Sequence, residues 1–299
     1  RYAASHGNGP LFARCVRGGV VKETIFTPSM RFLADLLQER TGQTLSEGRM
    51  WRIEAMLGPV LRAHGFRTFD ALTEAIRCDA SGPLAQLAVD ALLNNETSFF
   101  RDAHIFAMLG RDLVPAAMER IEAHGGERTL RVWCAGCSTG QEALSLAMLF
   151  RNGAERWPDW KVEILATDVS RTAIDKAQSG IIGQMEAQRG LPVADMLRWM
   201  EPHGEDWRIS PALRGMIEFK RDNLCDPAAP RGAYDIILCR NVLLYFDADK
   251  KQHMFDILAH HAAPGGHLLL GAGETTIGLT TQFSACPHYR GAYRRAEVA

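Results

Sequence analysis

The sequence predicts an α/β domain with a parallel, Rossmann-like sheet, preceded by an all-helical N-terminal domain. Between residues 28 and 93, apolar residues recur at the spacing of an amphipathic helix in four successive segments. After residue 105, apolar runs typical of buried strands alternate with helical segments, which indicates a parallel sheet covered on both faces. Residues 131–142 pass from such a run through a Gly-rich turn directly into a helix. That layout brings backbone N–H groups and a helix N-terminus close to a bound ligand.

The N-terminal helical domain is expected over residues 26–88, after a flexible tail at residues 1–25 that shows no sustained periodicity. Thr27 suits the N-cap of the first helix, with Pro28 at its first helical position. Gly58-Pro59 should kink or interrupt the second helix. The four helices are expected to begin near Pro28, Ser46, Thr68 and Pro83.

Residues 102–299 are expected to form the α/β domain, joined to the helices by a linker at residues 89–101. Strands are predicted at 130–135, 161–167, 216–220, 234–239, 266–271 and 289–295, and helices near 103–122, 140–152, 170–179 and 248–262. From about residue 180 to residue 214 the alternation breaks, because Gly and Pro separate apolar pieces that are too short for covering helices. We expect a small inserted β-subdomain of antiparallel strands whose free edge contacts another protein. A passive insertion that only shields the site is the alternative. The apolar pieces are Ile181-Ile182, Met196-Leu197 and Trp207-Arg208-Ile209.

Composition and charge argue against several classes of protein. The chain has 34 basic and 35 acidic residues, which argues against binding to nucleic acid through neutralised phosphates. No apolar run approaches the ~18 residues of a membrane span and no signal-peptide pattern is present, so no membrane insertion is expected. The seven cysteines are odd in number and scattered, as is typical of reduced thiols in a cytoplasmic protein. Cys134 and Cys137 form a C-x-x-C without a second pair to complete a zinc site, so no metal is expected.

The turn after the first strand of the sheet indicates the charge of the ligand. Only Gly136 and Gly140 are present, four residues apart, so the turn is not the G-x-G-x-x-G dinucleotide fingerprint. Glu142 lies in the first turn of the following helix, where its carboxylate would repel a pyrophosphate and attract a cationic or zwitterionic ligand. S-adenosylmethionine (SAM) carries a sulfonium and an ammonium group and fits this requirement.

Asp168 ends the next predicted strand, in the position of an acidic residue that accepts hydrogen bonds from ribose hydroxyls. Its distance in sequence from Gly136 exceeds the usual ~20 residues. The ordinary alternative is that Asp168 caps the helix that begins near Ser170. The combination of Gly136, Glu142 and Asp168 favours the ribose-binding role.

Five motifs occur in an order and spacing that identify a family. They are Asn95–Arg101 (NETSFFR), Val132–Gly140 (VWCAGCSTG), Ala166–Asp168 (ATD), Asn223-Leu224 and Cys239–Phe246 (CRNVLLYF), with PGGHLLLG at 264–271 after them. From about residue 28 to residue 295 the chain resembles the CheR-type chemotaxis receptor methyltransferases. The resemblance implies a helical N-terminal domain and a SAM-binding α/β domain with a small β-subdomain. It also implies methyl transfer from SAM to glutamate side chains in the cytoplasmic domain of methyl-accepting chemotaxis receptors, with S-adenosylhomocysteine as product. We expect a monomer.

The resemblance also assigns residues to the site. The SAM contacts that it implies are Asn95, Thr97, Arg101, Glu142, Asp168, Asn223, Leu224, Arg240 and Asn241. Taken singly, several of these residues have ordinary explanations as caps, turn residues or surface ion pairs, but the joint pattern favours a site. Arg101 and Tyr245 are the candidate catalytic residues, because a guanidinium can grip a carboxylate bidentately and a phenol can donate one hydrogen bond. A core aromatic is the alternative for Tyr245.

The sequence departs from the family pattern at two places. Gln141 replaces one of two adjacent glutamates in the loop before the helix, and Met56 aligns with an arginine that the second helix usually carries. Residues 26–88 hold seven basic and seven acidic residues, so no cationic face is expected to meet an acidic receptor. Two other functions remain open, namely a methyltransferase of this fold that acts on another protein or a small molecule, and a non-catalytic SAM or nucleotide sensor.

Overall fold

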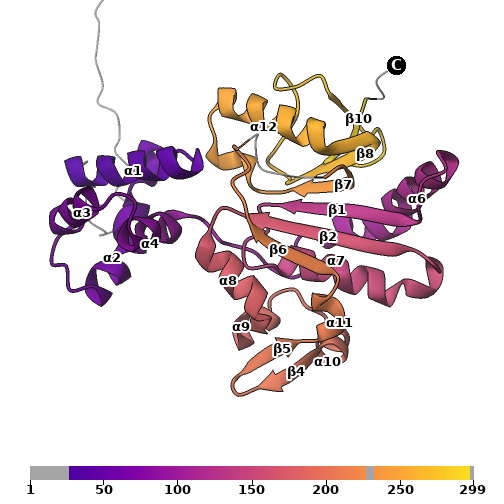
Figure 1. Cartoon of the computed structure of the whole chain (residues 1–299), viewed down its shortest axis with the longest axis horizontal. Helices are drawn as coiled ribbons and strands as arrows, with labels where there is room; N and C mark the ends of the chain where they lie inside the picture. Colours follow the sequence, from indigo (N-terminus) through magenta and orange to yellow (C-terminus); the bar gives the residue numbers. More distant parts are fainter. Residues whose placement is uncertain (1–26, 227–231, 297–299) are drawn as a thin grey trace, which may run out of the picture.

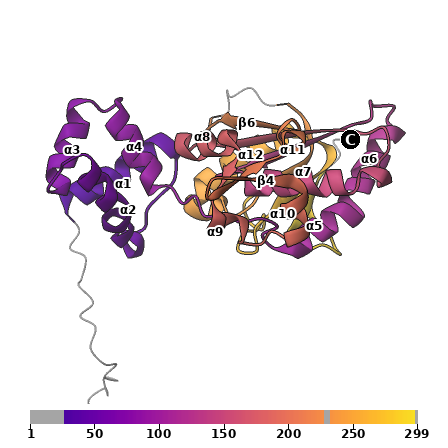
Figure 2. The same ribbon diagram turned by 90° about the horizontal axis from the view of Figure 1, so that it is seen from below.

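The computed structural model describes residues 27–226 and 232–296, and the predicted tail at residues 1–25 lies outside them. A bundle of four helices lies to one side of the part of the chain that contains the main sheet (Figure 1, Figure 2). The bundle comprises α1 (Pro28–Thr41), α2 (Trp51–Ala63), α3 (Phe69–Cys78) and α4 (Pro83–Leu92), with a short 3-10 helix at Glu47–Arg49. Its buried residues form an apolar core of their own, separate from the cores on the sheet.

Two predictions about the bundle have different outcomes. The Thr27 cap is confirmed, because its side-chain oxygen accepts a hydrogen bond from the Met30 N–H at 3.2 Å. Gly58-Pro59 was expected to kink or interrupt the second helix, and the interruption is wrong, because α2 runs through Pro59 without a break. Proline removes one N–H from the helical ladder. The neighbouring Leu57 and Val60 are buried in the bundle core, and this packing outweighs the lost hydrogen bond.

The main sheet has seven strands in the order β6-β2-β1-β7-β8-β10-β9 (Figure 1). The strands are β1 (Thr129–Ala135), β2 (Lys161–Asp168), β6 (Ile217–Arg221), β7 (Tyr234–Cys239), β8 (Ala262–Leu270), β9 (Phe283–Ala285) and β10 (Ala292–Arg295). The first five in spatial order pair in parallel, and β10 and β9 add antiparallel pairs at one edge. Six strands match the predicted ones. The seventh, β9, is too short for a period-2 pattern to be recognised.

Helices cover the sheet on both faces. They are α5 (Ala103–Met108), a π-helical turn at Leu109–Leu113, α6 (Val114–Ala123), α7 (Gln141–Asn152), α8 (Arg171–Ser179) and α12 (Ala248–His261). Along β1, Val132 and Cys134 pack in one core with residues of α7. Trp133 and Ala135 pack in another core with residues of α12. Alternate residues of a strand point to opposite faces, so α7 and α12 cover opposite sides.

The strand order reverses between β1 and β7. From β1 the chain proceeds outward through β2 and β6, and it then returns to the other side of β1 with β7 and β8. In open α/β sheets, ligands bind in the crevice outside the carboxyl ends of the strands at such a reversal. The topology therefore points to the loops that follow β1 and β7.

The segment at residues 180–214 carries a second, small sheet of antiparallel strands in the order β3-β5-β4 (Figure 1). Its elements are β3 (Ile181–Ile182), α9 (Gln184–Ala187), α10 (Val193–Trp199), β4 (Met200–His203), β5 (Asp206–Ile209) and α11 (Pro211–Arg214). We call residues 180–214 the insert. Met196 and Leu197 lie in α10, although their apolar pair was expected to be too short for a helix. A helix of seven residues offers too short a window for a helical period to be recognised.

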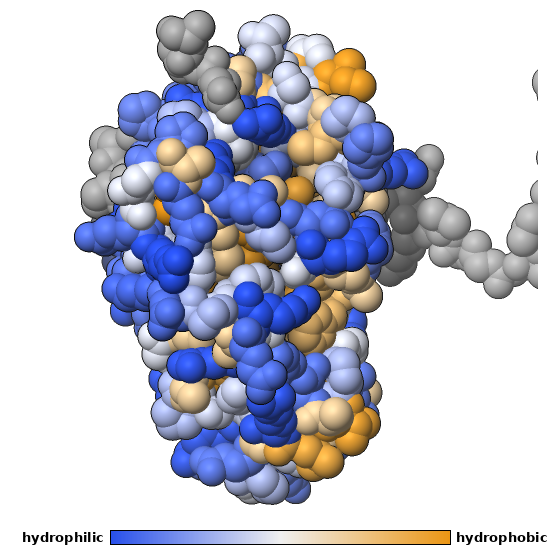
Figure 3. Space-filling model, turned by 90° about the vertical axis from the view of Figure 1, so that its right-hand side faces the viewer, coloured by the Kyte–Doolittle hydropathy of each residue, from blue (hydrophilic) through white to orange (hydrophobic). Residues whose placement is uncertain are grey.

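The surface on the side of the sheet away from the bundle is mostly hydrophilic (Figure 3). Several apolar groups on this face gather at its lower end, where Figure 1 shows the small sheet, and another lies at its upper end. In the insert, Val193 and Leu197 of α10 are 67% and 68% exposed. Among the described residues, no helix is long and apolar enough to cross a membrane.

Candidate functional site

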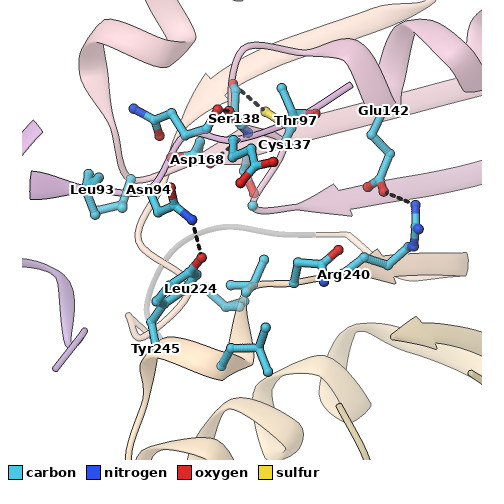
Figure 4. A pocket seen from close by; sticks show the side chains of 18 of the residues that line it. Leu93, Asn94, Thr97, Cys137, Ser138, Glu142, Asp168, Leu224, Arg240 and Tyr245 are labelled. Carbon is cyan, nitrogen blue, oxygen red and sulfur yellow. Dashed lines mark hydrogen bonds and ion pairs between the residues drawn. The ribbon is translucent and has the colours of Figure 1, made fainter. Parts of the chain in front are cut away.

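A pocket lies outside the carboxyl ends of β1, β2, β6 and β7, and the end of the helical bundle contributes to its wall (Figure 4). All ten residues that the motifs single out line this pocket. They are Asn95, Thr97, Arg101, Glu142, Asp168, Asn223, Leu224, Arg240, Asn241 and Tyr245. These residues come from the linker, from the first turn of α7, from the end of β2 and from the segments after β6 and β7. A parallel sheet thus brings motifs that are far apart in the sequence to one edge.

The Gly-rich turn after β1 passes close to the loop after β7. Gly136 has a φ of +86°, and a Cβ at this position would lie 2.3 Å from Cγ2 of Val242. The N–H groups of Gly136 and Cys137 both donate to the carbonyl of Thr167, at 2.8 and 2.9 Å. The turn is therefore fixed to the end of β2 and leaves no room for a side chain at residue 136.

Asp168 orders the turn as well as lining the pocket. Its Oδ2 accepts a hydrogen bond from the Ser138 N–H at 2.8 Å, and its Oδ1 accepts one from the Ser170 N–H at 2.9 Å. The hydroxyl of Ser138 donates to the carbonyl of Asn95 at 2.7 Å. The N-cap of α8 is Ser170, whose hydroxyl accepts from the Ala173 N–H, so the alternative of Asp168 as the helix cap is wrong. Burial raises the pKa of Asp168, and the backbone hydrogen bonds act in the opposite direction.

Glu142 and Arg240 form an ion pair in the pocket, with 2.9 Å between Oε2 and Nη1 (Figure 4). The Arg240 side chain is 1% exposed, and its Nη2 also donates to the carboxylate of Asp102 and the carbonyl of Arg101. Burial raises the pKa of Glu142, and the Arg240 charge lowers it again. One guanidinium is therefore shared by two carboxylates, so the cluster keeps a negative charge. The sequence predicts both partners as site residues but gives no sign of their pairing.

Two phenylalanines anchor the linker that carries Arg101. Phe99 is 1% exposed and belongs to a core beside the sheet. The N–H of Phe100 donates to Oγ of Ser145 in α7 at 2.9 Å. The guanidinium of Arg101 donates from Nη1 to the carbonyl of Glu96 at 3.2 Å. The backbone of this turn is thus held by other residues, and the arginine side chain extends into the pocket.

Tyr245 joins the loop after β7 to the helical bundle. Its hydroxyl accepts a hydrogen bond from Nδ2 of Asn94 (Figure 4), and its carbonyl accepts from the N–H of Thr44 at 2.8 Å. The Arg49 guanidinium lies 6.0 Å from the centroid of the tyrosine ring. The ring packs against the core below while the hydroxyl reaches the pocket, so Tyr245 is only partly a core aromatic. The predicted site does not include the three residues that contact Tyr245, namely Asn94, Thr44 and Arg49. Their contacts with Tyr245 link segments about 150 to 200 residues apart in the sequence, and no local pattern marks them.

The end of α1 also reaches the pocket. Nδ2 of Asn223 donates to the carbonyl of Arg40 at 3.3 Å, and Oδ1 of Asn223 accepts from the Cys225 N–H at 3.0 Å. Thr41 and Gln43 line the pocket next to these residues. The bundle therefore completes the wall near the loop after β6, which the sequence does not predict.

Glu274 holds the loop after β7 in place. Its Oε2 accepts hydrogen bonds from the N–H groups of Asn241 at 2.8 Å and Gly271 at 2.7 Å, and its Oε1 accepts from the Leu243 N–H at 2.7 Å. Asn241 adopts a φ of +60°, which is uncommon for a residue other than glycine. A carboxylate with three backbone donors stabilises this conformation. The sequence contained a signal for this residue, because Glu274 closely follows the predicted strand at 266–271, as site residues follow other strands of the sheet.

The charges of the pocket fit a cationic ligand. Four carboxylates face two guanidiniums, namely those of Glu96, Glu142, Asp168 and Asp222 and those of Arg101 and Arg240. Burial raises the pKa values of Glu142 and Asp168, and a bound cation would offset this cost. Leu224 and Val242 add apolar surface on which a flat base can lie. The sulfonium and ammonium groups of SAM match this set of side chains.

Comparisons with known proteins point to the same ligand. Residues 95–291 match the family model described as CheR methyltransferase, SAM binding domain. Chemotaxis protein methyltransferase Cher2 of Pseudomonas putida is 33% identical over 251 residues, which cover 83% of this chain and 90% of that protein. The chemotaxis protein methyltransferase of Vibrio anguillarum is 32% identical over 263 residues, which cover 87% of this chain and 94% of that protein. The chain therefore belongs to the CheR family of SAM-dependent methyltransferases.

Proposed function

We propose that this enzyme transfers the methyl group of SAM to glutamate side chains of methyl-accepting chemotaxis receptors. The observation that carries the proposal is the convergence of all ten motif residues on one acidic pocket. The names of relatives that are 33% and 32% identical over most of the chain support an acceptor in chemotaxis. The products are a glutamate methyl ester and S-adenosylhomocysteine. An acceptor in the cytoplasmic domain of a receptor places the reaction in the cytoplasm.

We assign the SAM contacts to the residues that the motifs identify. Asp168 accepts hydrogen bonds from the ribose, since its carboxylate stands at the end of β2 with acceptor capacity left over. Glu142 and its neighbours hold the amino acid portion, whose ammonium group offsets the negative charge of that cluster. The remaining contacts are Asn95, Thr97, Arg101, Asn223, Leu224, Arg240 and Asn241.

The reaction needs orientation more than proton transfer. A glutamate side chain has a reference pKa of ~4.3 and is already ionised at neutral pH, so no general base is required. Bound SAM supplies an electrophilic methyl group on its sulfonium. The protein aligns the acceptor carboxylate with that methyl group and excludes water, which is worth ~7–11 kcal/mol at best. Because the pocket carries excess negative charge, the acceptor carboxylate also needs a cationic or hydrogen-bonding group beside it.

Arg101 and Tyr245 are assigned to this task. Arg101 donates from Nη1 to one carbonyl, and the other N–H groups of the guanidinium can bind a carboxylate. The oxygen of the Tyr245 hydroxyl accepts from Asn94, so its proton points elsewhere and is available to the acceptor. Both side chains line the pocket and can bind the same carboxylate.

Incubation with methyl-labelled SAM and purified cytoplasmic fragments of the organism's chemoreceptors tests the proposed reaction. We expect label on glutamate residues as base-labile methyl esters, because an ester hydrolyses in mild alkali and an N-methyl group does not. Label that survives alkali, or none on any receptor fragment, would contradict the proposal. Peptide mapping then identifies the acceptor residues.

We further propose that the insert contacts the receptor. In the proposed division of the chain, residues 26–88 form the helical domain, residues 89–101 form the linker that contacts SAM, and residues 102–299 form the methyltransferase domain. In the described part of the chain, β4 pairs only with β5 and so leaves one edge open to strand addition. The exposed Val193 and Leu197 lie on the same insert. These features favour a protein partner over a small-molecule acceptor.

Replacing Asp168 with alanine is expected to weaken SAM binding by ~1–3 kcal/mol, because charge-assisted hydrogen bonds to the ribose are lost. Isothermal titration calorimetry with SAM and with S-adenosylhomocysteine measures the change. Asp175→Ala is the control, since that carboxylate is 65% exposed on α8 and lies outside the pocket. An unchanged affinity in Asp168→Ala would remove this residue from the site.

SAM affinity is expected to fall as the pH is lowered. The fall should begin at a higher pH than it would if the pocket carboxylates had their ordinary pKa values. The pKa values of Glu142 and Asp168 are raised by burial in the free protein, and the cationic ligand prefers their ionised forms. Protonation therefore opposes binding, and binding releases protons in the range of the raised pKa values. Calorimetry in buffers of different ionisation enthalpy, from neutral to about pH 5, measures both effects. Affinity and proton release that stay constant over this range would contradict the expectation.

A further inference from the structure

A loop of the insert packs directly on the linker that carries Arg101. The N–H of Phe99 donates to the carbonyl of Arg189 at 3.2 Å. The guanidinium of Arg189 forms an ion pair with Glu96 at 2.6 Å. Gly190 has a φ of +87°, and a Cβ on it would lie 2.2 Å from the carbonyl oxygen of Phe99. The backbones of the loop and the linker thus lie so close together that residue 190 cannot carry a side chain.

The same loop is held firmly within the insert. The Glu186 carboxylate accepts from the Gly183 N–H at 2.9 Å and pairs with Lys176 of α8. The Arg189 N–H donates to the carbonyl of Glu186 at 3.1 Å. Contacts therefore run continuously from α8, which packs on the main sheet, through the loop to the linker.

The linker turn around Arg101 is strained and needs such support. Phe100 and Asp102, on either side of Arg101, adopt φ values of +46° and +59°. Left-handed conformations are uncommon for such residues, and each persists only where surrounding contacts impose it. Within the pocket, Arg240 donates to the carbonyl of Arg101 and the carboxylate of Asp102, and the Phe100 N–H donates to Ser145. A further contact lies one residue before Phe100, where the loop of the insert meets Phe99.

We propose that the insert is a positioning element of the methyl-transfer site. Through Gly190 and Arg189 it sets the backbone of the turn that presents Arg101 to the pocket. This role is separate from any contact with a receptor, and it makes the insert more than a shield over the site. The role of Arg101 toward the acceptor rests on the proposed function. The effect on SAM binding does not, because the same linker also contributes Asn95 and Thr97 to the pocket.

Gly190→Ala tests the proposal, with Gly204→Ala as the matched control. Both glycines lie in the insert and have positive φ values, +87° and +64°, so both substitutions strain the backbone. At Gly204 nothing lies within 4 Å of an added Cβ, whereas at Gly190 the Cβ would overlap Phe99. We expect Gly190→Ala to weaken SAM binding about tenfold and to slow methyl transfer on the order of a hundredfold, because a displacement of about 1 Å is enough for such losses. Gly204→Ala should leave SAM affinity close to the wild-type value.

Amide hydrogen exchange at Phe99 and Phe100 supplies a readout that does not depend on the acceptor. Exchange at these two amides should accelerate in Gly190→Ala and stay unchanged in Gly204→Ala. SAM affinity and amide exchange therefore test the positioning role even if chemoreceptors prove not to be substrates. Equal effects of the two variants, or a folded Gly190→Ala with unchanged SAM affinity and exchange, would overturn the proposal.

A charge exchange covers the case in which Gly190→Ala does not fold. Arg189→Glu places a carboxylate beside Glu96 and should loosen the linker, whereas the double variant with Glu96→Arg restores an ion pair of reversed polarity. We expect the Phe99 amide to exchange two- to fivefold faster in the single variant, the scale of an exposed ion pair, and at close to the wild-type rate in the double variant. Amide exchange is the readout here, because Glu96 lines the pocket and Glu96→Arg also changes its charge. No acceleration in the single variant, or an acceleration without recovery, would show that this contact does not position the linker.

Discussion

Arg240→Met is expected to lower the free energy of unfolding by about 3–5 kcal/mol, the largest stability effect among the pocket residues. The Arg240 side chain is 1% exposed and serves Glu142, Asp102 and the carbonyl of Arg101 at once. Methionine has a similar length but no charge, so two carboxylates would be left close together without a cation. Urea unfolding followed by circular dichroism, with the slope of the transition checked against the wild type, measures the loss.

Arg111→Met is the control for this substitution. Arg111 also pairs with a carboxylate, that of Asp112, but its side chain is 75% exposed, so the loss should be much smaller than in Arg240→Met. The effect of Arg240→Met should shrink in mild acid, because burial already raises the pKa of Glu142 and loss of the cation raises it further. Equal losses in the two variants would show that the buried cluster contributes nothing beyond an ordinary surface pair.

Arg101→Ala is expected to reduce methyl transfer on the order of a hundredfold while the melting temperature changes by no more than about 2 °C. The turn is anchored by Phe99, which is 1% exposed, and by the hydrogen bond from Phe100 to Ser145, and neither depends on the guanidinium. The side chain itself makes one hydrogen bond, to the carbonyl of Glu96. Initial rates with receptor fragments, SAM affinity and thermal unfolding should be measured on the same preparation.

Arg101→Lys separates charge from geometry in this experiment. A lysine keeps the charge but lacks the planar pair of donors, so it should restore SAM affinity more than turnover if Arg101 grips the acceptor carboxylate. Arg171→Ala, which removes an arginine that is 67% exposed on α8, should leave the rate unchanged. A fall in melting temperature that matches the fall in rate would instead make Arg101 a structural residue.

The convergence of the motif residues on one pocket could be predicted where one strand end carries one motif. Gly136 follows β1, Asp168 ends β2, and Arg240 follows β7, so the parallel sheet alone brings them together once the strands are recognised. What could not be predicted depends on contacts between distant segments. The pairing of Glu142 with Arg240 and the hydrogen bond from Asn94 to Tyr245 require knowledge of the packing, which periodicity and motif spacing do not contain.

The fold shows the same division between local and distant information. Long apolar strands and well-capped helices such as α1 were predictable, because periodicity and capping residues are local properties. The unbroken course of α2 through Pro59 is decided by burial of its neighbours in the bundle, not by local preference. Likewise, α10 and β9 are short elements whose conformation depends on what they pack against.

The left-handed residues beside Arg101 also bear on how this enzyme can be engineered. The positive φ of Phe100 costs ~1–3 kcal/mol, so glycine or asparagine there would relax the backbone, whereas Asp102 is also held by its ion pair with Arg240. A directed-evolution screen that scores heat resistance alone would reward such relaxation and let the arginine sample more orientations. Thermostable variants selected in this way should have lower catalytic rates. In this enzyme the trade-off between stability and activity would be concentrated in the backbone turn around Arg101.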